Sequence, residues 1–490
     1  MPISQGSNWM YDTADADFNI ETSVGIFGDN TDGEISQTGG DRKTHTISCW
    51  HKRSPEGFAM GDGEGVADYS SNDLWGTPSE GDTLRFNAQD LAFFHEGGTG
   101  SSLVTDRKFR DFAAWYHFVV AIDTTQSTAA NRIKIYVNGI QETSFSTETY
   151  PDQNDEFKLM QSGQTFYIGA GHIGNSSING LGYYADFIIV DGAALAPTEF
   201  GEFDADSGIW KPKKFTGDLN VGSGTNGAHY KFEGTAEGTG SGSTGLDSGG
   251  ESNNMNFENQ KGGLPDTPTN NFTTWQGGVL MNSGGANGDN IKLYDGNTRI
   301  ARANGTGYTT AYNTMSPSAG KWYMEFLVPE TDITCVVGAT PRSKVNSADR
   351  QTYYLGQNSG DGTVGKHMDG GSVYQDGSGT SSTDVSADDI IGVAMDLDNN
   401  KVHFSVNNSW TNSSDPANTT NGFALLDEPY FFGHTSYQPN KTNFKTNFGG
   451  YTSMTISSAA NDANGYGDFE YAPPTGYYAL CTKNLAEYGG

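Results

Sequence analysis

The chain contains one pattern twice: an apolar segment, a turn, and an alternating segment that ends in Val-Asn. The first copy covers residues 115–123 and 133–139, and the second covers 389–398 and 401–408. In each second segment, apolar residues alternate with polar ones. A period of two with one apolar face is typical of a half-buried antiparallel strand. Two such hairpins, far apart in the chain, predict two β-sandwich domains.

The predicted fold is all-β, with two antiparallel β-sandwich (jelly-roll-type) domains. With 490 residues the chain is long enough for each domain to bury its own core. We expect an N-terminal segment at 1–40, partly packed on the first domain, and a first sandwich at 41–214. A connector rich in Gly, Ser and Asn follows at 215–274, and part of it packs as a strand. The second sandwich covers 275–490.

Charge and cysteine content restrict the partners and the compartment. The net charge of −31 excludes nucleic acid as a partner, because phosphate binding needs clustered Lys and Arg. It also repels anionic surfaces unless divalent cations bridge the charges. Three scattered cysteines form no disulfide framework, and Cys49 and Cys335 are expected to be small buried residues of strands. We therefore expect folding in a reducing cytoplasm. No apolar run approaches the roughly 20 residues that span a bilayer, so membrane insertion is not expected.

Catalytic patterns are weak. A glycan hydrolase needs two carboxylates about 5–10 Å apart across a cleft. The nearest candidates lie at 199–206, after the last predicted strand of the first domain, where a solvated acidic turn is the simpler interpretation. No Gly-x-Ser-x-Gly motif stands at a strand-to-helix turn. The sequence predicts no catalytic residue and no enzyme.

Two acidic loops could hold calcium, which prefers oxygen ligands. One loop contains Asp29 and Asp32, and the other contains Asp396 and Asp398. A structural turn is the alternative for both. We expect that the protein requires no cofactor. Calcium is the ion that these two loops could bind.

Aromatic side chains on loops near amides and carboxylates are the expected sugar contacts. Trp75, the pair Tyr183 and Tyr184, and Trp410 fit this description, with packing at the domain rim as the alternative. By contrast, three tryptophans within strand patterns are expected to be core residues: Trp50, Trp115 and Trp322.

Several segments in combination resemble known families. Segments 115–123, 135–140, 166–169 and 184–192 resemble laminin-G-type domains of the concanavalin A-like lectin/glucanase superfamily. The second half resembles a SPRY domain through five segments in the order that this domain uses: 321–326, 337–339, 391–396, 402–407 and 447–450.

The tandem arrangement resembles virion proteins of tailed, marine-type bacteriophages. Three connector-like segments add to this resemblance: 199–213, 266–272 and 474–485. It implies a virion surface component, such as a tail fibre, appendage or capsid decoration protein, made in the host bacterial cytoplasm. The implied partners are other virion proteins, further copies of the chain in a homo-oligomer, with a trimer favoured, and host-surface glycans. A phage glycanase or depolymerase and a purely architectural adaptor are the alternatives.

Overall fold

The computed structural model describes residues 18–27, 31–54, 58–59, 72–78, 81–87, 89–96, 100–170, 181–276, 291–302, 308–328, 335–345, 353–437 and 444–489. The chain divides into two compact units. The first unit contains residues 1–54 and 65–270, and the second contains 55–64 and 271–490.

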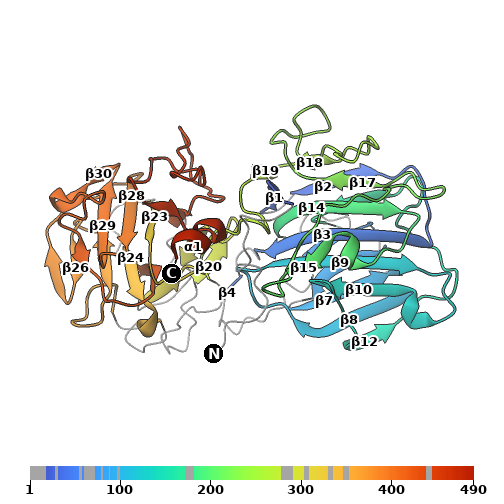
Figure 1. Ribbon diagram of the computed structural model, residues 1–490, viewed down its shortest axis with the longest axis horizontal. Helices are drawn as coiled ribbons and strands as arrows, with labels where there is room; N and C mark the ends of the chain where they lie inside the picture. Colours follow the sequence, from blue (N-terminus) through green and yellow to red (C-terminus); the bar gives the residue numbers. More distant parts are fainter. Residues whose placement is uncertain are drawn as a thin grey trace. The chain divides into compact units, whose positions relative to one another are not determined.

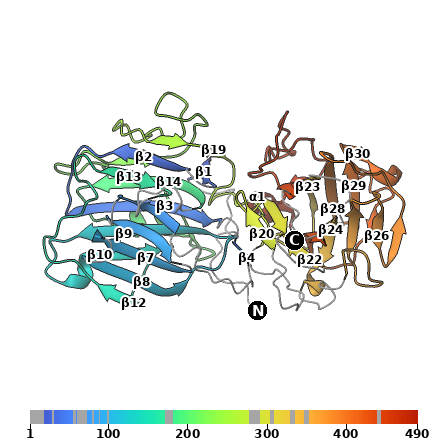
Figure 2. The ribbon, with the colours of Figure 1, turned by 180° about the vertical axis from the view of Figure 1, so that it is seen from behind.

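The first unit is a sandwich of two antiparallel sheets, seen from opposite sides in Figures 1 and 2. One sheet, here called sheet A, has the order β11-β10-β9-β3-β14-β1-β19, with β17 also paired to β14. Its strands are β1 (Ser23–Ile26), β3 (Thr44–Arg53), β9 (Trp115–Asp123), β10 (Ile133–Val137), β11 (Ile140–Gln141), β14 (Gly182–Asp191), β17 (Ala228–Tyr230) and β19 (Lys261–Leu264).

The facing sheet, sheet B, has the order β12-β8-β7-β6-β5-β13-β2-β18. Its strands are β2 (Asp32–Ser36), β5 (Asn72–Gly76), β6 (Thr83–Asn87), β7 (Asp90–His95), β8 (Ser101–Lys108), β12 (Phe145–Thr149), β13 (Thr165–Ile168) and β18 (Asn256–Glu258). A small hairpin of β15 (Gly201–Phe203) and β16 (Trp210–Pro212) lies over sheet A, in front of β3 and β9 in Figure 1.

Alternation builds the core between these sheets. In β9, Phe118 and Val120 face sheet B, whereas Val119 faces the opposite side and packs with Phe200 and Leu219. Sheet A is therefore apolar on both faces, and the chain after β14 covers its outer face. The predicted connector, residues 215–274, was expected to pack in part as a strand; up to residue 270 it lies within the first unit, and it supplies β17, β18 and β19.

The second unit is also a two-sheet sandwich. Its larger sheet has the order β30-β29-β28-β23-β33-β21-β20-β4, with β31 paired to β29 and β34 parallel to β23. The strands are β4 (Phe58–Ala59), β20 (Ile291–Tyr294), β21 (Arg299–Arg302), β23 (Lys321–Leu327), β28 (Ile390–Asp396), β29 (Lys401–Val406), β30 (Ser409–Trp410), β31 (Phe423–Ala424), β33 (Phe444–Asn447) and β34 (Tyr478–Ala479).

The smaller sheet has the order β22-β32-β24-β25-β26-β27. It contains β22 (Thr309–Tyr312), β24 (Cys335–Pro341), β25 (Val364–His367), β26 (Val373–Gln375), β27 (Ser378–Thr380) and β32 (Tyr430–Ser436). The chain's described helices are α1 (Thr482–Tyr488) and short 3-10 turns at Ala129–Asn131, Pro197–Glu199, Arg342–Lys344 and Thr411–Ser413. Within the described ranges, no helix is long and apolar enough to cross a membrane.

The predicted all-β fold class is confirmed, and both hairpins form. Val120 pairs with Ile135 in β9 and β10, and Val393 pairs with Phe404 in β28 and β29. Trp50, Trp115 and Trp322 are at most 1% exposed, as core residues should be. Cys49 and Cys335 are buried free thiols.

Candidate glycan-binding groove

Three of the four aromatic residues predicted to touch sugar lie in the core, not on loops. Trp75 is in β5, is 1% exposed, and contacts Phe93 and Phe166. Tyr183 and Tyr184 are both in β14 and fully buried. These positions correct the prediction, since a ring without an exposed face cannot stack on a sugar.

The physical reason for the Trp75 error is a β-bulge. The register of β5 against β6 shifts between Asp73 and Trp75, which leaves Leu74 as an extra residue. As a result, Leu74 and Trp75 both enter the core, against the strict alternation of a regular strand. Trp410 is different: it is half-buried at the end of β30, and its role as a ligand contact stays a prediction.

Of the two acidic loops predicted for calcium, the one with Asp396 and Asp398 has structural partners. Asp396 is fully buried, forms an ion pair with Lys321 at 3.0 Å, and accepts hydrogen bonds from Asn399. Asp398 accepts a hydrogen bond from the backbone N–H of Gly320. Asp32 lies in β2, and Asp29 is outside the described residues. Among the residues that are described, no three His, Cys, Asp or Glu side chains gather as a metal site would require.

The acidic segment at 199–206 forms a turn, as expected from the sequence. Asp204 accepts hydrogen bonds from the backbone N–H and hydroxyl of Ser207 and pairs with Lys211 at 3.3 Å. The backbone and hydroxyl of Ser207, followed by Lys211, lower the pKa of Asp204 to about 2. Glu202 also pairs with Lys211. These carboxylates hold the β15–β16 hairpin and do not form a catalytic pair.

The same hairpin places an aromatic stack on the outer face of sheet A. The Trp210 indole N–H donates to Nδ1 of His117 at 3.0 Å, and Trp50 stacks on the same imidazole with ring centroids 4.7 Å apart. An indole can only donate, so Nδ1 of His117 accepts, and its Nε2–H donates to the Ser48 hydroxyl. Burial lowers the pKa of His117 to about 3, which keeps the imidazole neutral.

A polar groove lies beside β17 in the first unit. We call it the β17 groove: it has a volume of about 510 Å³ and is lined by Phe18 and by residues of segments 214–220, 229–231 and 248–251. This volume is within the range of about 300–1,000 Å³ that small-molecule sites occupy. The sequence analysis did not predict this groove, because most residues of its walls belong to the segment that was predicted to be a connector.

One residue of the β17 groove lining, His229, forms a pair with an aspartate of β14. In β17, Ala228 and Tyr230 enter the core, so His229 faces outward and its Nε2 lies 2.6 Å from an Asp186 carboxylate oxygen. Asp186 has a positive φ of 47° at the bulge of β14. Bulges of this kind redirect a side chain, and here the redirected carboxylate orients the imidazole.

Two loops form the walls of the groove. Asp247 holds one loop by accepting hydrogen bonds from the backbone N–H groups of His229, Gly249 and Asn253. Asn220, on the other loop, donates from Nδ2 to Glu251 at 2.7 Å and so joins the two walls. The groove is therefore formed before any ligand arrives.

One aromatic ring contributes apolar surface to the groove. Phe215 is half-buried and stacks on Phe200, with ring centroids 5.1 Å apart and an interplanar angle of 14°. Four polar side chains of the lining have no hydrogen-bond or ion-pair partner among the described residues: Lys214, Asp218, Lys231 and Ser248. A polar ligand could use all four.

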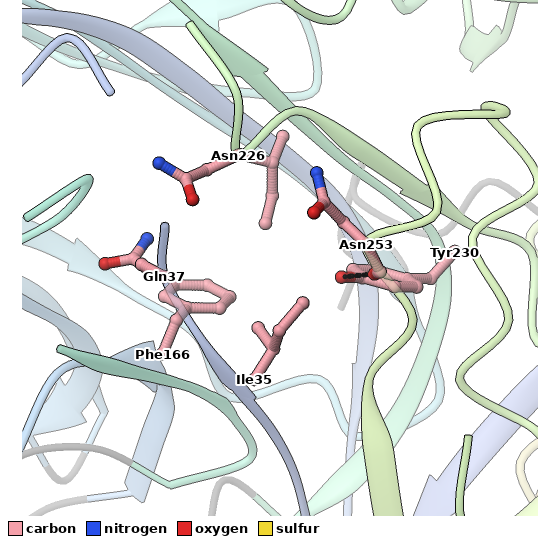
Figure 3. Close-up of a pocket in the computed structure, with 7 residues that line it drawn as sticks. Ile35, Gln37, Phe166, Asn226, Tyr230 and Asn253 are labelled. Carbon is pink, nitrogen blue, oxygen red and sulfur yellow. Dashed lines mark hydrogen bonds between the residues drawn. The ribbon is translucent and has the colours of Figure 1, made fainter. Parts of the chain in front are cut away.

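A second cavity in the first unit is much smaller (Figure 3). Its volume of about 10 Å³ is close to what one water molecule needs. Its three amides already have partners: Gln37 accepts from Met160 N–H, Asn226 accepts from Thr38 N–H, and Asn253 donates to the Gly227 carbonyl. The cavity suits a buried water and not a sugar.

The outer face of sheet B carries three carboxylates, and the sequence analysis named only one of them, Asp32, as a calcium candidate. Asp32 and Glu34 share one face of β2, and Glu258 of β18 lies directly opposite Asp32. Burial, followed by the charges of Glu34 and Glu258, raises the pKa of Asp32 to about 6. The Asp-x-Glu spacing was the available signal, because residues i and i+2 of a strand share a face.

Comparisons with known proteins agree with this fold. Residues 27–197 match the family model of the concanavalin A-like lectin/glucanases superfamily, which is less than half of the chain. No curated protein matches the chain. The β-sandwich of the first unit is therefore similar to the concanavalin A-like lectin/glucanase fold.

Three solved structures show low-scoring similarity to this chain. A human SPRY domain is 18% identical over 32% of this chain and 93% of its own, with a TM-score of 0.24. A Bacteroides ovatus protein provisionally described as carbohydrate-binding is 16% identical over 50% of this chain and 60% of its own, with a TM-score of 0.30. A heptameric SAP-like pentraxin from Limulus polyphemus is 14% identical over 36% and 80%, with a TM-score of 0.25. TM-scores this low transfer no binding residue to this chain.

Proposed function

We propose that this is a non-enzymatic carbohydrate-binding protein and that the β17 groove holds the glycan. A fold alone does not fix a function, so the proposal rests on the groove. The carrying observation is its lining, which combines the Phe215 ring with hydroxyl, carboxylate and ammonium groups that have no partner among the residues that the structure describes. Ligand sites typically combine apolar surface with a few placed polar groups, and a sugar ring presents an apolar face and hydroxyls together.

We further propose that this binding occurs on the surface of a tailed-bacteriophage particle, where the protein contacts host glycans. The support is the sequence resemblance of the tandem and of its connector segments. One of these segments has a defined role in each unit: Asp266 is buried in the first unit, and Phe272 pairs with Cys481 in the second. A symmetric oligomer, with a trimer favoured, is the expected arrangement there, because cyclic symmetry is usual for such assemblies. Light scattering on the purified chain tests this.

Glycan binding is tested with an array of oligosaccharides, followed by calorimetry on the best binder. Ser248→Trp places a large ring inside the groove and should weaken binding at least about tenfold, or 1.4 kcal/mol. Ser127→Trp is the matched control, because Ser127 is exposed on a loop of the same unit away from the groove lining. Equal loss in both variants, or no loss in Ser248→Trp, would remove the groove from the proposal.

One observation favours glycan hydrolysis as a second candidate function. Asp32, with its pKa raised to about 6, lies among carboxylates that share its face of sheet B, and glycosidases pair a protonated acid with an ionised one. Release of reducing ends from the best-binding glycan, abolished in Asp32→Asn but retained in Asp106→Asn, would establish this activity. Asp106 is an exposed carboxylate on β8 of the same sheet.

A further inference from the structure

We infer that the ligand of the β17 groove is an acidic saccharide, whose carboxylate binds between Lys214 and Lys231. This inference rests on the proposed function and names the class of glycan. Both lysines line the groove, and neither ammonium has an ion-pair or hydrogen-bond partner among the described residues.

The two groove lysines belong to a protein with 59 acidic and 28 basic side chains. Elsewhere in the first unit, Lys52, Lys108 and Lys211 all pair with aspartates. In the groove, two of the nearby carboxylates are already occupied. Asp186 binds His229, and Glu251 accepts from Asn220.

Asp218 is the one carboxylate of the lining without a hydrogen-bond donor among the described residues. It offsets one of the two lysine charges and can accept a hydrogen bond from a sugar hydroxyl. The two lysine ammoniums can both donate charge-assisted hydrogen bonds to one carboxylate on the ligand, and the Ser248 hydroxyl can bind a ring hydroxyl. A uronic-acid-type residue within a short oligosaccharide has this combination of groups.

The net charge of −31 does not oppose this assignment at contact distance. At physiological ionic strength the Debye length is about 8 Å, so distant carboxylates of the protein are largely screened. A carboxylate placed between two ammoniums interacts mainly with those two. The overall charge instead slows the approach of acidic polymers at low salt.

The test compares one glycan in two forms. The best acidic binder from the array is measured by calorimetry before and after chemical reduction of its carboxyl groups to hydroxymethyl groups. We expect reduction to weaken binding at least about tenfold. The Lys214→Gln/Lys231→Gln variant should lose a similar factor toward the acidic form and show no change toward the reduced form. Lys213→Gln is the matched control, because the Lys213 ammonium donates to the Thr198 carbonyl and does not line the groove.

The outcomes separate the inference from the proposed function. Two outcomes would overturn the acidic class while the groove function stands. In the first, neutral glycans bind best. In the second, the reduced form binds as tightly as the acidic form, and Ser248→Trp weakens this binding. If no glycan of any charge binds, both fail. Loss of binding to both forms in the double lysine variant, with an unchanged thermal unfolding curve, would also overturn the charge-based assignment.

Discussion

Replacing Lys52 by methionine should destabilise the first unit by about 3–5 kcal/mol, because it leaves a carboxylate buried without its cation. Lys52 and Asp266 form an ion pair of 2.8 Å, with side chains 0% and 1% exposed. The Trp115 indole also donates to Asp266 at 3.1 Å. This pair joins β3 to the segment that ends the first unit.

The double variant Lys52→Met/Asp266→Leu should cost much less than the sum of its single variants. It removes both charges, and its main remaining cost is the unsatisfied Trp115 N–H, worth about 1–3 kcal/mol. Each single variant should cost about 3–5 kcal/mol. The coupling free energy should therefore be at least about 3 kcal/mol.

Urea unfolding, followed by tryptophan fluorescence, measures these costs. Met324→Ala, in the core of the second unit, identifies the transition of that unit. Lys108→Met is the surface control, because Lys108 is 44% exposed and its pair with Asp90 should contribute under about 1 kcal/mol. A Lys52→Met cost as small as that of Lys108→Met, or additive single variants, would refute the reasoning.

Three further predictions concern protonation and metal binding. Burial lowers the pKa of His117 to about 3, below its unfolded value of 6.5, so stability present above pH 6.5 is lost as pH falls. At pH 5 this loss is about 2 kcal/mol, and His117→Gln should reduce the pH 8-to-5 change in unfolding free energy by that amount. Burial raises the pKa of Glu325 to about 7, although Asn447 and the backbone of Glu470 and Tyr471 donate to it. Stability from Glu325 is therefore complete below about pH 4.5 and decreases as pH rises through 7, and Glu325→Gln should flatten this slope; an unchanged slope would contradict the raised pKa. Because Asp396 is occupied by Lys321 and Asn399, millimolar calcium should leave the melting temperature of the second unit unchanged, and a rise abolished by Asp398→Ala would show the opposite.

The period-two alternation of apolar and polar residues in the sequence determined much of the fold. Strands β9 and β28 are long and rich in β-branched residues, so local preference and burial agree. That agreement made the two hairpins, the core tryptophans and the all-β class predictable. The expectation that nucleic acid is not a partner likewise comes from the sequence, because net charge is a property of composition.

Tertiary structure decided how most of residues 215–270 are ordered, beyond the one strand that the sequence predicts there. Their Gly, Ser and Asn content indicates a flexible linker, yet carboxylates of β14 and of the segment itself order them. Asp191, at the end of β14, accepts hydrogen bonds from the backbone N–H groups of Thr225 and Asn226, and Asp247 holds the groove loop in the same way. Composition does not record such non-local bonds.

The candidate site shows the same division. The sequence presents Lys214, Phe215, His229 and Ser248 as scattered residues of a linker, without the spacing of a motif. A bulge in β14, the pairing of Ile188 with His229, and the outward side of β17 bring them around one groove. Bulges and strand neighbours depend on how the whole sheet packs, so the sequence determined the sandwiches, and only the folded sheet determined the groove.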